Sequence, residues 1–264
     1  MTILEQIKQH KLLEVATKKE LYPTKLLEQT PYFSSSCVSM KKYISDTSRS
    51  GIIAEFKRKS PSKGDINKYA NAQEVTLGYM QSGASALSVI TDEHFFGAKK
   101  DDLQTARKFN YCPILRKDFI VDEYQIVEAK SMGADVVLLI AKMLSPKEIT
   151  QFSLFAKSLG LEVFLEFHNK EEIKQNEHAV IDLAGINNRN LNSFEVDIEN
   201  SIRLANLLPK EVLKIVESGI DSSQTMQKLK QNGFNGFLIG EYFMRHSNPA
   251  EKCKELIKQL HDGN

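Results

Sequence analysis

Eight short runs of apolar and β-branched residues recur from residue 51 onward, and no other feature constrains the fold of this chain as strongly. Their starts are 23 to 35 residues apart, about the length of one strand–helix unit. Most are apolar nearly throughout, as is typical of parallel strands covered on both faces. We therefore expect an α/β fold in which eight such units close into a (β/α)8 TIM barrel. The runs span residues 51–56, 86–90, 112–116, 135–141, 161–167, 184–188, 213–218 and 236–240.

Helix signals lie between these runs. Ser145 reads as an N-cap, with Pro146 at the first helical position and Glu148 completing a capping box. Asp122 with Gln125, and Asn248 with Glu251, repeat this pattern. A doubly wound open sheet is the alternative, but its first strand usually leads into a glycine-rich turn, and here the chain reads EFKRKSPSKG, which is not GxGxxG.

The first part of the chain is less regular. Residues 3–20 read as an amphipathic helix with Ile3, Ile7 and Val15 near one stripe. An irregular stretch with prolines at 23 and 31 follows. We expect one domain over residues 1–264, of which residues 1–48 form an N-terminal helical extension.

Composition excludes several classes of protein. Lys and Arg number 35 against 34 for Asp and Glu, which argues against a strongly basic surface for nucleic acid or membrane. The three cysteines, Cys37, Cys112 and Cys253, are far apart and form no CxxC pair, which fits free thiols in a reducing cytoplasm. The N-terminus lacks an apolar signal core, and no apolar run is long enough to span a bilayer. We expect a cytoplasmic protein without a nucleic-acid or membrane partner.

Charged or amide side chains end five of the expected strands. In a (β/α)8 barrel these ends meet at one rim, where active sites lie. Carboxylates and ammonium groups that crowd there shift one another's pKa values, which acid–base catalysis needs. A single charge at a strand end is more often a solvated loop residue, but five such ends indicate a site. The residues are Glu55 and Lys57, Arg116 to Asp118 with Lys117 in the middle, Glu166, Asn187 and Arg189, and Glu217 and Ser218.

Glycine-containing stretches follow the last two expected strands. ESGI contains Gly219 and LIGE contains Gly240, while KSPSKG after the first strand contains Ser60. Loops after the seventh and eighth strands of such barrels often hold a phosphate on backbone N–H groups, and glycine permits close approach to an anion. Ordinary turn glycines are the alternative interpretation, and it would be preferred if only one stretch were present.

Several long motifs together resemble the indole-3-glycerol phosphate synthase family. They cover about residues 3 to 257 in order, and no isomerase or tryptophan synthase segment follows, which is typical of the monofunctional form. The resemblance implies conversion of 1-(2-carboxyphenylamino)-1-deoxyribulose 5-phosphate into indole-3-glycerol phosphate, carbon dioxide and water, in tryptophan biosynthesis. It also implies a lyase without metal or organic cofactor. The motifs are IIAEFKRKSPSKGDI, LSVITDEHFFGAKKDDL, PILRKDFIVDEYQIVEAKSMGADVVLLIA, GINNRNL, IVESGI and FLIGEYFMR.

The resemblance implies roles for the strand-end residues. Lys117 matches the general acid for ring closure. Lys57 matches the lysine that holds the substrate carboxylate and is a candidate donor of the later proton, with Glu55 beside it. Glu166 matches a catalytic glutamate. Asn187 and Arg189 match the pair that orients substrate and catalytic lysine. Glu217 matches a residue that contacts a substrate hydroxyl.

The same resemblance implies the binding residues. Phe96 and Phe119 match apolar walls around the anilino ring, and the remaining positions match substrate and phosphate contacts at Ser60, Ser218, Gly219 and Gly240. The extension of residues 1–48 matches a segment that caps the active-site face. We expect a small-molecule sugar phosphate as partner, and a monomer or a weakly associating dimer.

Some points stay open at this stage. Glu241 replaces a serine that many relatives carry, and we expect its side chain to point away from the phosphate; Ala98 is a second departure. Lys57 and Arg189 would lower the pKa of Lys117 while Glu55 and Glu166 would raise it. A metal interpretation of His168 lacks support, because the six histidines show no HExxH spacing. A catalytically silent sugar-phosphate-binding barrel and an isomerase-like barrel are the alternative functions.

Overall fold

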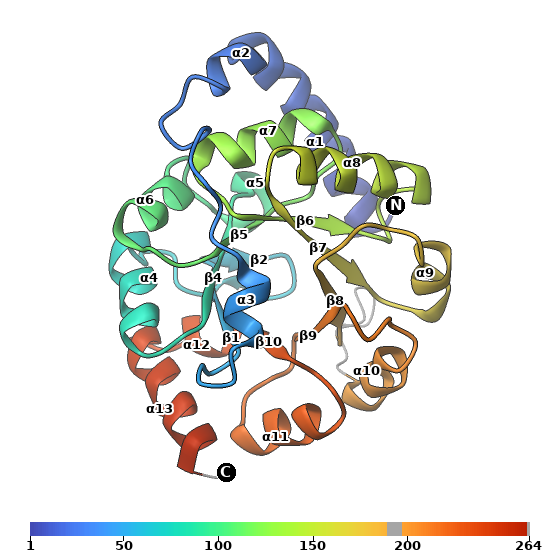
Figure 1. Cartoon of the computed structure of the whole chain (residues 1–264). Coiled ribbons are helices and arrows are strands. Elements are labelled where there is room, and N and C mark those ends of the chain that lie inside the picture. The colour runs from blue at the N-terminus through green and yellow to red at the C-terminus, as the bar shows by residue number, and fades with distance from the viewer. Residues whose placement is uncertain (189–196, 263–264) are drawn as a thin grey trace.

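The computed structural model describes residues 1–188 and 197–262, so Arg189 lies outside the described residues. Eight parallel strands close into a barrel in the order β1-β10-β9-β8-β7-β6-β5-β4 (Figure 1). This confirms the predicted TIM barrel. The strands are β1 (Ile52–Phe56), β4 (Ala86–Ile90), β5 (Ile114–Lys117), β6 (Val136–Ile140), β7 (Glu162–Phe167), β8 (Leu183–Asn187), β9 (Leu213–Glu217) and β10 (Gly236–Ile239).

The barrel strands are buried almost along their whole length, because side chains fill the barrel on one face and helices cover the other. Their register brings the charged strand ends to one level. Ile90 pairs with Lys117, Ile140 pairs with Glu166, and Asn187 pairs with Glu217. The strand ends singled out in the sequence therefore meet at a single rim.

Helices pack outside the barrel, between successive strands (Figure 1). Ser145 caps α8 with the predicted capping box. Asp122 caps α7 differently from the prediction, because its side chain accepts from the backbone of Tyr124, while the Gln125 amide bonds to Phe119 and Val121. The outer helices are α4 (Ala72–Gln81), α6 (Asp102–Phe109), α7 (Glu123–Met132), α8 (Pro146–Ser158), α9 (Lys170–Gln175), α10 (Ile198–Ala205), α11 (Ser223–Gln231) and α13 (Pro249–Asp262).

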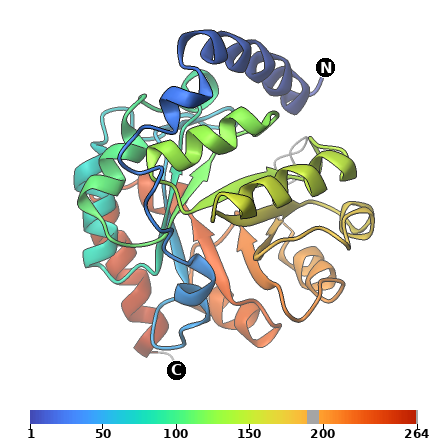
Figure 2. The ribbon, with the colours of Figure 1, turned by 45° about the horizontal axis from the view of Figure 1, so that its top comes forward.

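The N-terminal extension divides between two ends of the barrel. Helices α1 (Ile3–Leu21) and α2 (Thr24–Leu27) lie beside α7, as Figures 1 and 2 show. Helix α3 (Met40–Ser45) lies at the opposite end, where its N-cap Ser39 and the backbone of Lys41 bond to Glu162, the first residue of β7. Met40 is fully buried there. One segment of the extension therefore lies at the bottom of the barrel, whereas the sequence analysis expected all of residues 1–48 to cap the active-site face.

Short extra elements occupy the loops that follow the strands. A two-stranded hairpin, β2 (Lys59–Ser60) with β3 (Gly64–Asp65), follows β1. Helix α5 (Glu93–Phe96) follows β4, and α12 (Glu241–Met244) follows β10. None of these elements was predicted as a separate element, yet they carry Ser60, Phe96 and Glu241 to the rim.

Candidate active site

An open cavity lies at the carboxyl ends of the barrel strands. Of the thirteen site residues predicted from the sequence, the twelve that fall in the described part of the chain all line it. Lys57 and Lys117 therefore face the same cavity rather than opposite sides of the molecule, as the sequence interpretation requires. The twelve are Glu55, Lys57, Ser60, Phe96, Lys117, Phe119, Glu166, Asn187, Glu217, Ser218, Gly219 and Gly240.

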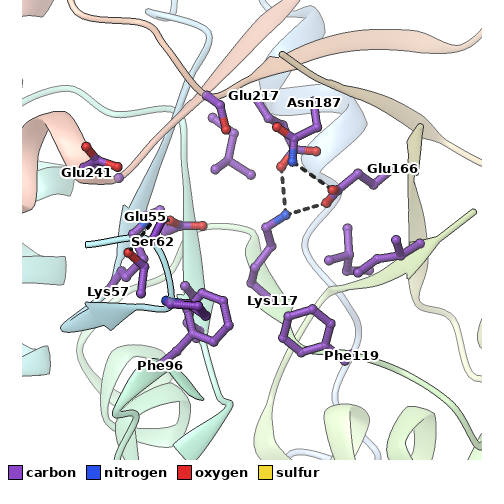
Figure 3. A pocket seen from close by; sticks show the side chains of 18 of the residues that line it. Glu55, Lys57, Ser62, Phe96, Lys117, Phe119, Glu166, Asn187, Glu217 and Glu241 are labelled. Carbon is purple, nitrogen blue, oxygen red and sulfur yellow. Dashed lines mark hydrogen bonds and ion pairs between the residues drawn. The ribbon is translucent and has the colours of Figure 1, made fainter. Parts of the chain in front are cut away.

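Lys117 lies between two buried glutamates (Figure 3). Its ammonium donates to Glu166 Oε2 at 2.9 Å and to Glu217 Oε2 at 2.7 Å. Asn187 Nδ2 donates to the other oxygen of Glu166 at 2.9 Å. Because β5, β7, β8 and β9 are rigid strands of the barrel, these side chains are held in place before any substrate arrives.

Electrostatics in this cluster favour a charged lysine. Burial alone would lower the pKa of Lys117, but Glu166, Glu217 and Glu55 outweigh it and raise that pKa well above its usual range. Burial would raise the pKa of Glu166, yet Lys117 and His168 hold it well below the usual range. For Glu217, burial and the charge of Glu166 together raise the pKa to about 7. Among the described residues the carboxylates therefore outweigh burial, and the effect of Arg189 on the pKa of Lys117 stays a prediction.

A second ion pair lies elsewhere on the cavity wall. Lys57 Nζ is 2.8 Å from Glu55 Oε1, and Figure 3 shows this pair apart from the Lys117 cluster. A Cβ at Gly240 would overlap the Glu55 carboxylate, so the glycine leaves room for that carboxylate. Two cations therefore face one cavity, each with its own carboxylate partner.

Aromatic and aliphatic side chains line the remaining wall. The ring centroids of Phe96 and Phe119 are 5.6 Å apart, and both rings face the cavity (Figure 3). Helix α1 contributes Ile3, Leu4 and Ile7 to the lining. The sequence analysis expected the extension to cap the active-site face, but it did not name these three side chains as part of the site.

Small residues also line the cavity, among them Ser60, Ser62, Gly219 and Gly240. Ser218, directly before Gly219, has a φ of 68°, a left-handed conformation that is uncommon for a residue with a side chain. Asn188 Nδ2 donates to its carbonyl at 2.8 Å and helps to hold it. Glu241 also lines the cavity, and Figure 3 shows it apart from the Lys117 cluster; its direction relative to a bound phosphate stays a prediction.

Sequence comparison identifies the family to which this arrangement corresponds. A family model described as indole-3-glycerol phosphate synthase matches residues 4–256. The chain belongs to the indole-3-glycerol phosphate synthase family. An indole-3-glycerol phosphate synthase from Bacteroides thetaiotaomicron is 45% identical over 258 residues, which cover 98% of each chain. Another from Legionella pneumophila is 40% identical and covers 97% of this chain and 98% of its own.

Solved structures with low sequence identity share the fold of this family member. A 3-hexulose-6-phosphate synthase from Salmonella typhimurium aligns with a TM-score of 0.64 at 14% identity, covering 81% of this chain and 100% of its own. A chain of the tryptophan synthase complex from Pyrococcus furiosus aligns with a TM-score of 0.57 at 14% identity, covering 81% and 98%. These likenesses show the barrel fold. No helix in residues 1–188 and 197–262 has the length and apolar character needed to cross a membrane.

His168 contributes to the site of this family member from behind the cavity wall. Its Nε2 is 3.3 Å from Glu166 Oε1 and its Nδ1 is 3.7 Å from Glu172 Oε2, so the ring lies between two carboxylates. Burial alone would lower the pKa of His168, but these two neighbours raise it to about 9. The two carboxylates therefore favour the protonated ring beside Glu166, an arrangement that the sequence reasoning did not predict.

Proposed function

We propose that this chain converts 1-(2-carboxyphenylamino)-1-deoxyribulose 5-phosphate into indole-3-glycerol phosphate, carbon dioxide and water, at the cavity around Lys117. The observation that carries the proposal is the convergence of Lys57 and Lys117, each paired with buried glutamates, on one cavity. Family membership supports the same reaction. The activity is that of a carboxy-lyase of tryptophan biosynthesis.

Ring closure needs an acid at the ribulose carbonyl. The ring carbon that carries the carboxylate attacks the carbonyl carbon, and the carbonyl oxygen takes a proton to become a hydroxyl. Lys117 supplies that proton, because its raised pKa keeps it protonated at neutral pH. Glu217 is 2.7 Å away with a pKa of about 7, so it can return a proton to the lysine at neutral pH. Glu166 stays ionised and stabilises the positive nitrogen that develops.

Decarboxylation and dehydration follow at the same cavity. Lys57 holds the substrate carboxylate until carbon dioxide leaves and its bonding electrons return to the ring. The hydroxyl then leaves as water, with Lys57 as candidate proton donor and Glu55 as its partner at 2.8 Å. The neighbouring CH2 group of the new ring loses a proton at the same stage, with Glu166 as candidate base, and the double bond of the indole forms. Phe96 and Phe119 hold the aromatic ring between these two cations. Asn187 orients Glu166 and through it the catalytic lysine. The role of Arg189 in orienting substrate and lysine stays a prediction, because it lies outside the described residues.

The small residues of the cavity lining receive the phosphate in this proposal. Gly219 and Gly240 let backbone N–H groups approach an anion closely, and Ser60 adds a hydroxyl. Ser218 contacts the sugar hydroxyls beside Glu217. The remaining expectations are a cytoplasmic location and a monomer or weak dimer, and the three free thiols fit the reducing location.

One assay tests the proposal directly. The chain contains no tryptophan, so indole fluorescence of the product is read against a low protein background. The purified protein is expected to produce that signal from the carboxyphenylamino ribulose phosphate. Lys117→Met should lower kcat by about 10²–10⁴-fold, whereas Lys142→Met, at an exposed lysine, should leave it unchanged.

Two results would oppose the assignment. Absence of product with the wild-type protein would exclude the reaction, and binding of the substrate without turnover would favour the silent sugar-phosphate-binding barrel. An undiminished rate with Lys117→Met would remove Lys117 from its role. Circular dichroism of each variant checks that the comparison is made between folded proteins.

A further inference from the structure

A fully buried lysine lies outside the set of residues used above. Lys11 belongs to α1, one turn after Ile7, and is 0% exposed. Its ammonium is 3.0 Å from Asp92 Oδ2, from Asp118 Oδ1 and from Glu14 Oε2. A buried ammonium with an unpaired charge would be costly, so three carboxylates around it make the arrangement possible.

Asp92 joins this lysine to the aromatic wall of the cavity. It is 0% exposed and caps α5, because its Oδ1 accepts from the backbone of Phe95 at 2.6 Å and of Phe96 at 3.2 Å. Its other oxygen, Oδ2, is buried and accepts no hydrogen bond from the described residues. The ammonium of Lys11 is therefore the charge that balances this oxygen.

Asp118 joins the same lysine to the strand end that carries Lys117. Asp118 directly follows Lys117, and its Oδ1 accepts from the backbone of Phe119 at 2.8 Å. Its Oδ2 accepts from Thr91 at 2.6 Å and from Arg116 at 3.0 Å. The carboxyl is 2% exposed, so these contacts are made away from water.

The two aspartates would repel each other without the lysine. They come from the loops after β4 and β5, and those loops carry Phe96 and Phe119, whose rings face each other at 5.6 Å. The pKa of Asp118 lies well below its usual range, because Lys11 and Arg116 outweigh the effect of burial. Lys11 is thus the shared counter-charge that lets two buried carboxylates lie side by side.

We propose that Lys11 is a positioning residue: from the N-terminal helix it bridges Asp92 and Asp118 and so holds Phe96 and Phe119 at the spacing that receives the aromatic ring of the substrate. This inference rests on the proposed function for the identity of the ring. Lys117 has its own partners, Glu166 and Glu217, on the other strands. Loss of Lys11 therefore acts on substrate binding more than on proton transfer.

The kinetic test compares two lysines of the same helix. Lys11→Met removes the bridge, whereas Lys8→Met removes a different contact of α1 with the barrel, the bond from Lys8 Nζ to the Met143 carbonyl at 2.7 Å. For Lys11→Met we expect kcat/KM to fall about 10- to 100-fold, mostly through a rise in KM. For Lys8→Met we expect less than about a twofold change, since that variant leaves both aspartates paired.

A second measurement does not depend on activity. Hydrogen exchange at the amides of Phe95 and Phe96 reports whether Asp92 still caps α5, and we expect faster exchange in Lys11→Met than in wild type or Lys8→Met. The double variant Lys11→Met with Asp92→Asn relieves the repulsion between the two carboxylates but does not restore the bridge between them. It should also exchange faster than wild type, and it decides the matter if Lys11→Met alone does not fold.

Equal KM values and equal exchange at these two amides in Lys11→Met and Lys8→Met would overturn the proposal. Wild-type protection of the amides in the double variant would overturn it as well. A wild-type protein that makes no product would instead refute the proposed function, and the exchange comparison would still decide the role of Lys11.

Discussion

Glu166 and Glu217 contact the same ammonium of Lys117, yet their pKa values move in opposite directions. Burial and the neighbouring carboxylate raise the pKa of Glu217 to about 7 from 4.5, while Lys117 and His168 lower that of Glu166 against the effect of burial. Each difference from the unfolded state makes stability depend on pH. Glu217→Gln and Glu166→Gln should therefore change the pH dependence of the free energy of unfolding in opposite directions.

The magnitude follows for Glu217. A raised pKa gives stability that is fully present below pH 4.5 and is lost as pH rises through about 7. At about 1.4 kcal/mol for each pKa unit, wild type loses about 2–3 kcal/mol between pH 5 and pH 8 on account of this carboxyl. Glutamine at position 217 cannot ionise, so Glu217→Gln does not undergo this loss. Its free energy of unfolding relative to wild type should therefore rise by the same amount between pH 5 and pH 8.

Glu166→Gln is the matched control. In wild type, the lowered pKa of Glu166 gives stability that is present above pH 4.5. That stability is lost only as pH falls through the lower pKa that Glu166 has in the folded protein. The glutamine variant lacks that stability, so it should be less stable than wild type at pH 8. Both variants keep a carbonyl oxygen that can accept from Lys117, and both should lose catalytic activity.

Urea unfolding at pH 5 and pH 8 measures these differences. The free energy of unfolding falls by about 1–3 kcal/mol per M urea. The unfolding midpoint of Glu217→Gln relative to that of wild type should therefore rise by about 1 M urea or more from pH 5 to pH 8. A difference that stays constant from pH 5 to pH 8 would refute the reasoning. It would mean that Glu217 is an ordinary ionised partner of Lys117 and cannot return a proton to it at neutral pH.

Three further predictions concern single contacts. Gly240→Ala places a Cβ against the Glu55 carboxylate and should lower kcat/KM by about tenfold or more in the fluorescence assay without unfolding the protein; unchanged kinetics would contradict the close approach. Arg58→Met leaves the buried carboxylate of Asp102, paired through Nη2 at 2.8 Å, without its cation, so urea unfolding should show a loss of about 3–5 kcal/mol. Ser145→Ala removes the cap of α8 and should cost about 1 kcal/mol by the same measurement, and a larger loss would show that the cap does more than satisfy one helix end.

The sequence was a good guide to the barrel because the pattern that carries it is local. Residues 136–141 are apolar throughout, and a short strand buried on both faces accommodates such a run. The hairpin after β1 was missed, because two residues in each strand leave no periodicity to detect. The capping box predicted between Asp122 and Gln125 was also wrong. Asp122 accepts from the backbone of Tyr124, and the side chain of Gln125 bonds to the backbone of Val121 instead.

The meeting of the charged strand-end residues at one site followed from the parallel arrangement of the strands. Parallel strands of a closed barrel end at one rim, so Lys57 and Lys117 had to face the same cavity once eight strands were recognised. The charge states of those residues could not be predicted, because the pKa of a buried group depends on distances of a few ångströms to groups on other strands. The lysine and Glu217 both shifted upward for that reason.

The amino-acid order by itself therefore determined the fold class and the membership of the rim, because apolar periodicity and strand ends are properties of neighbouring residues. Only the tertiary structure decided that Lys11, far from the site in the chain, lies between Asp92 and Asp118, and that α3 closes the opposite end of the barrel. These contacts join segments separated by about eighty residues or more, and they exist only after the barrel has closed. Lys11 lies on the same face of α1 as the buried Ile7 and Val15, and only the packing of α1 on the barrel shows which carboxylates surround its ammonium.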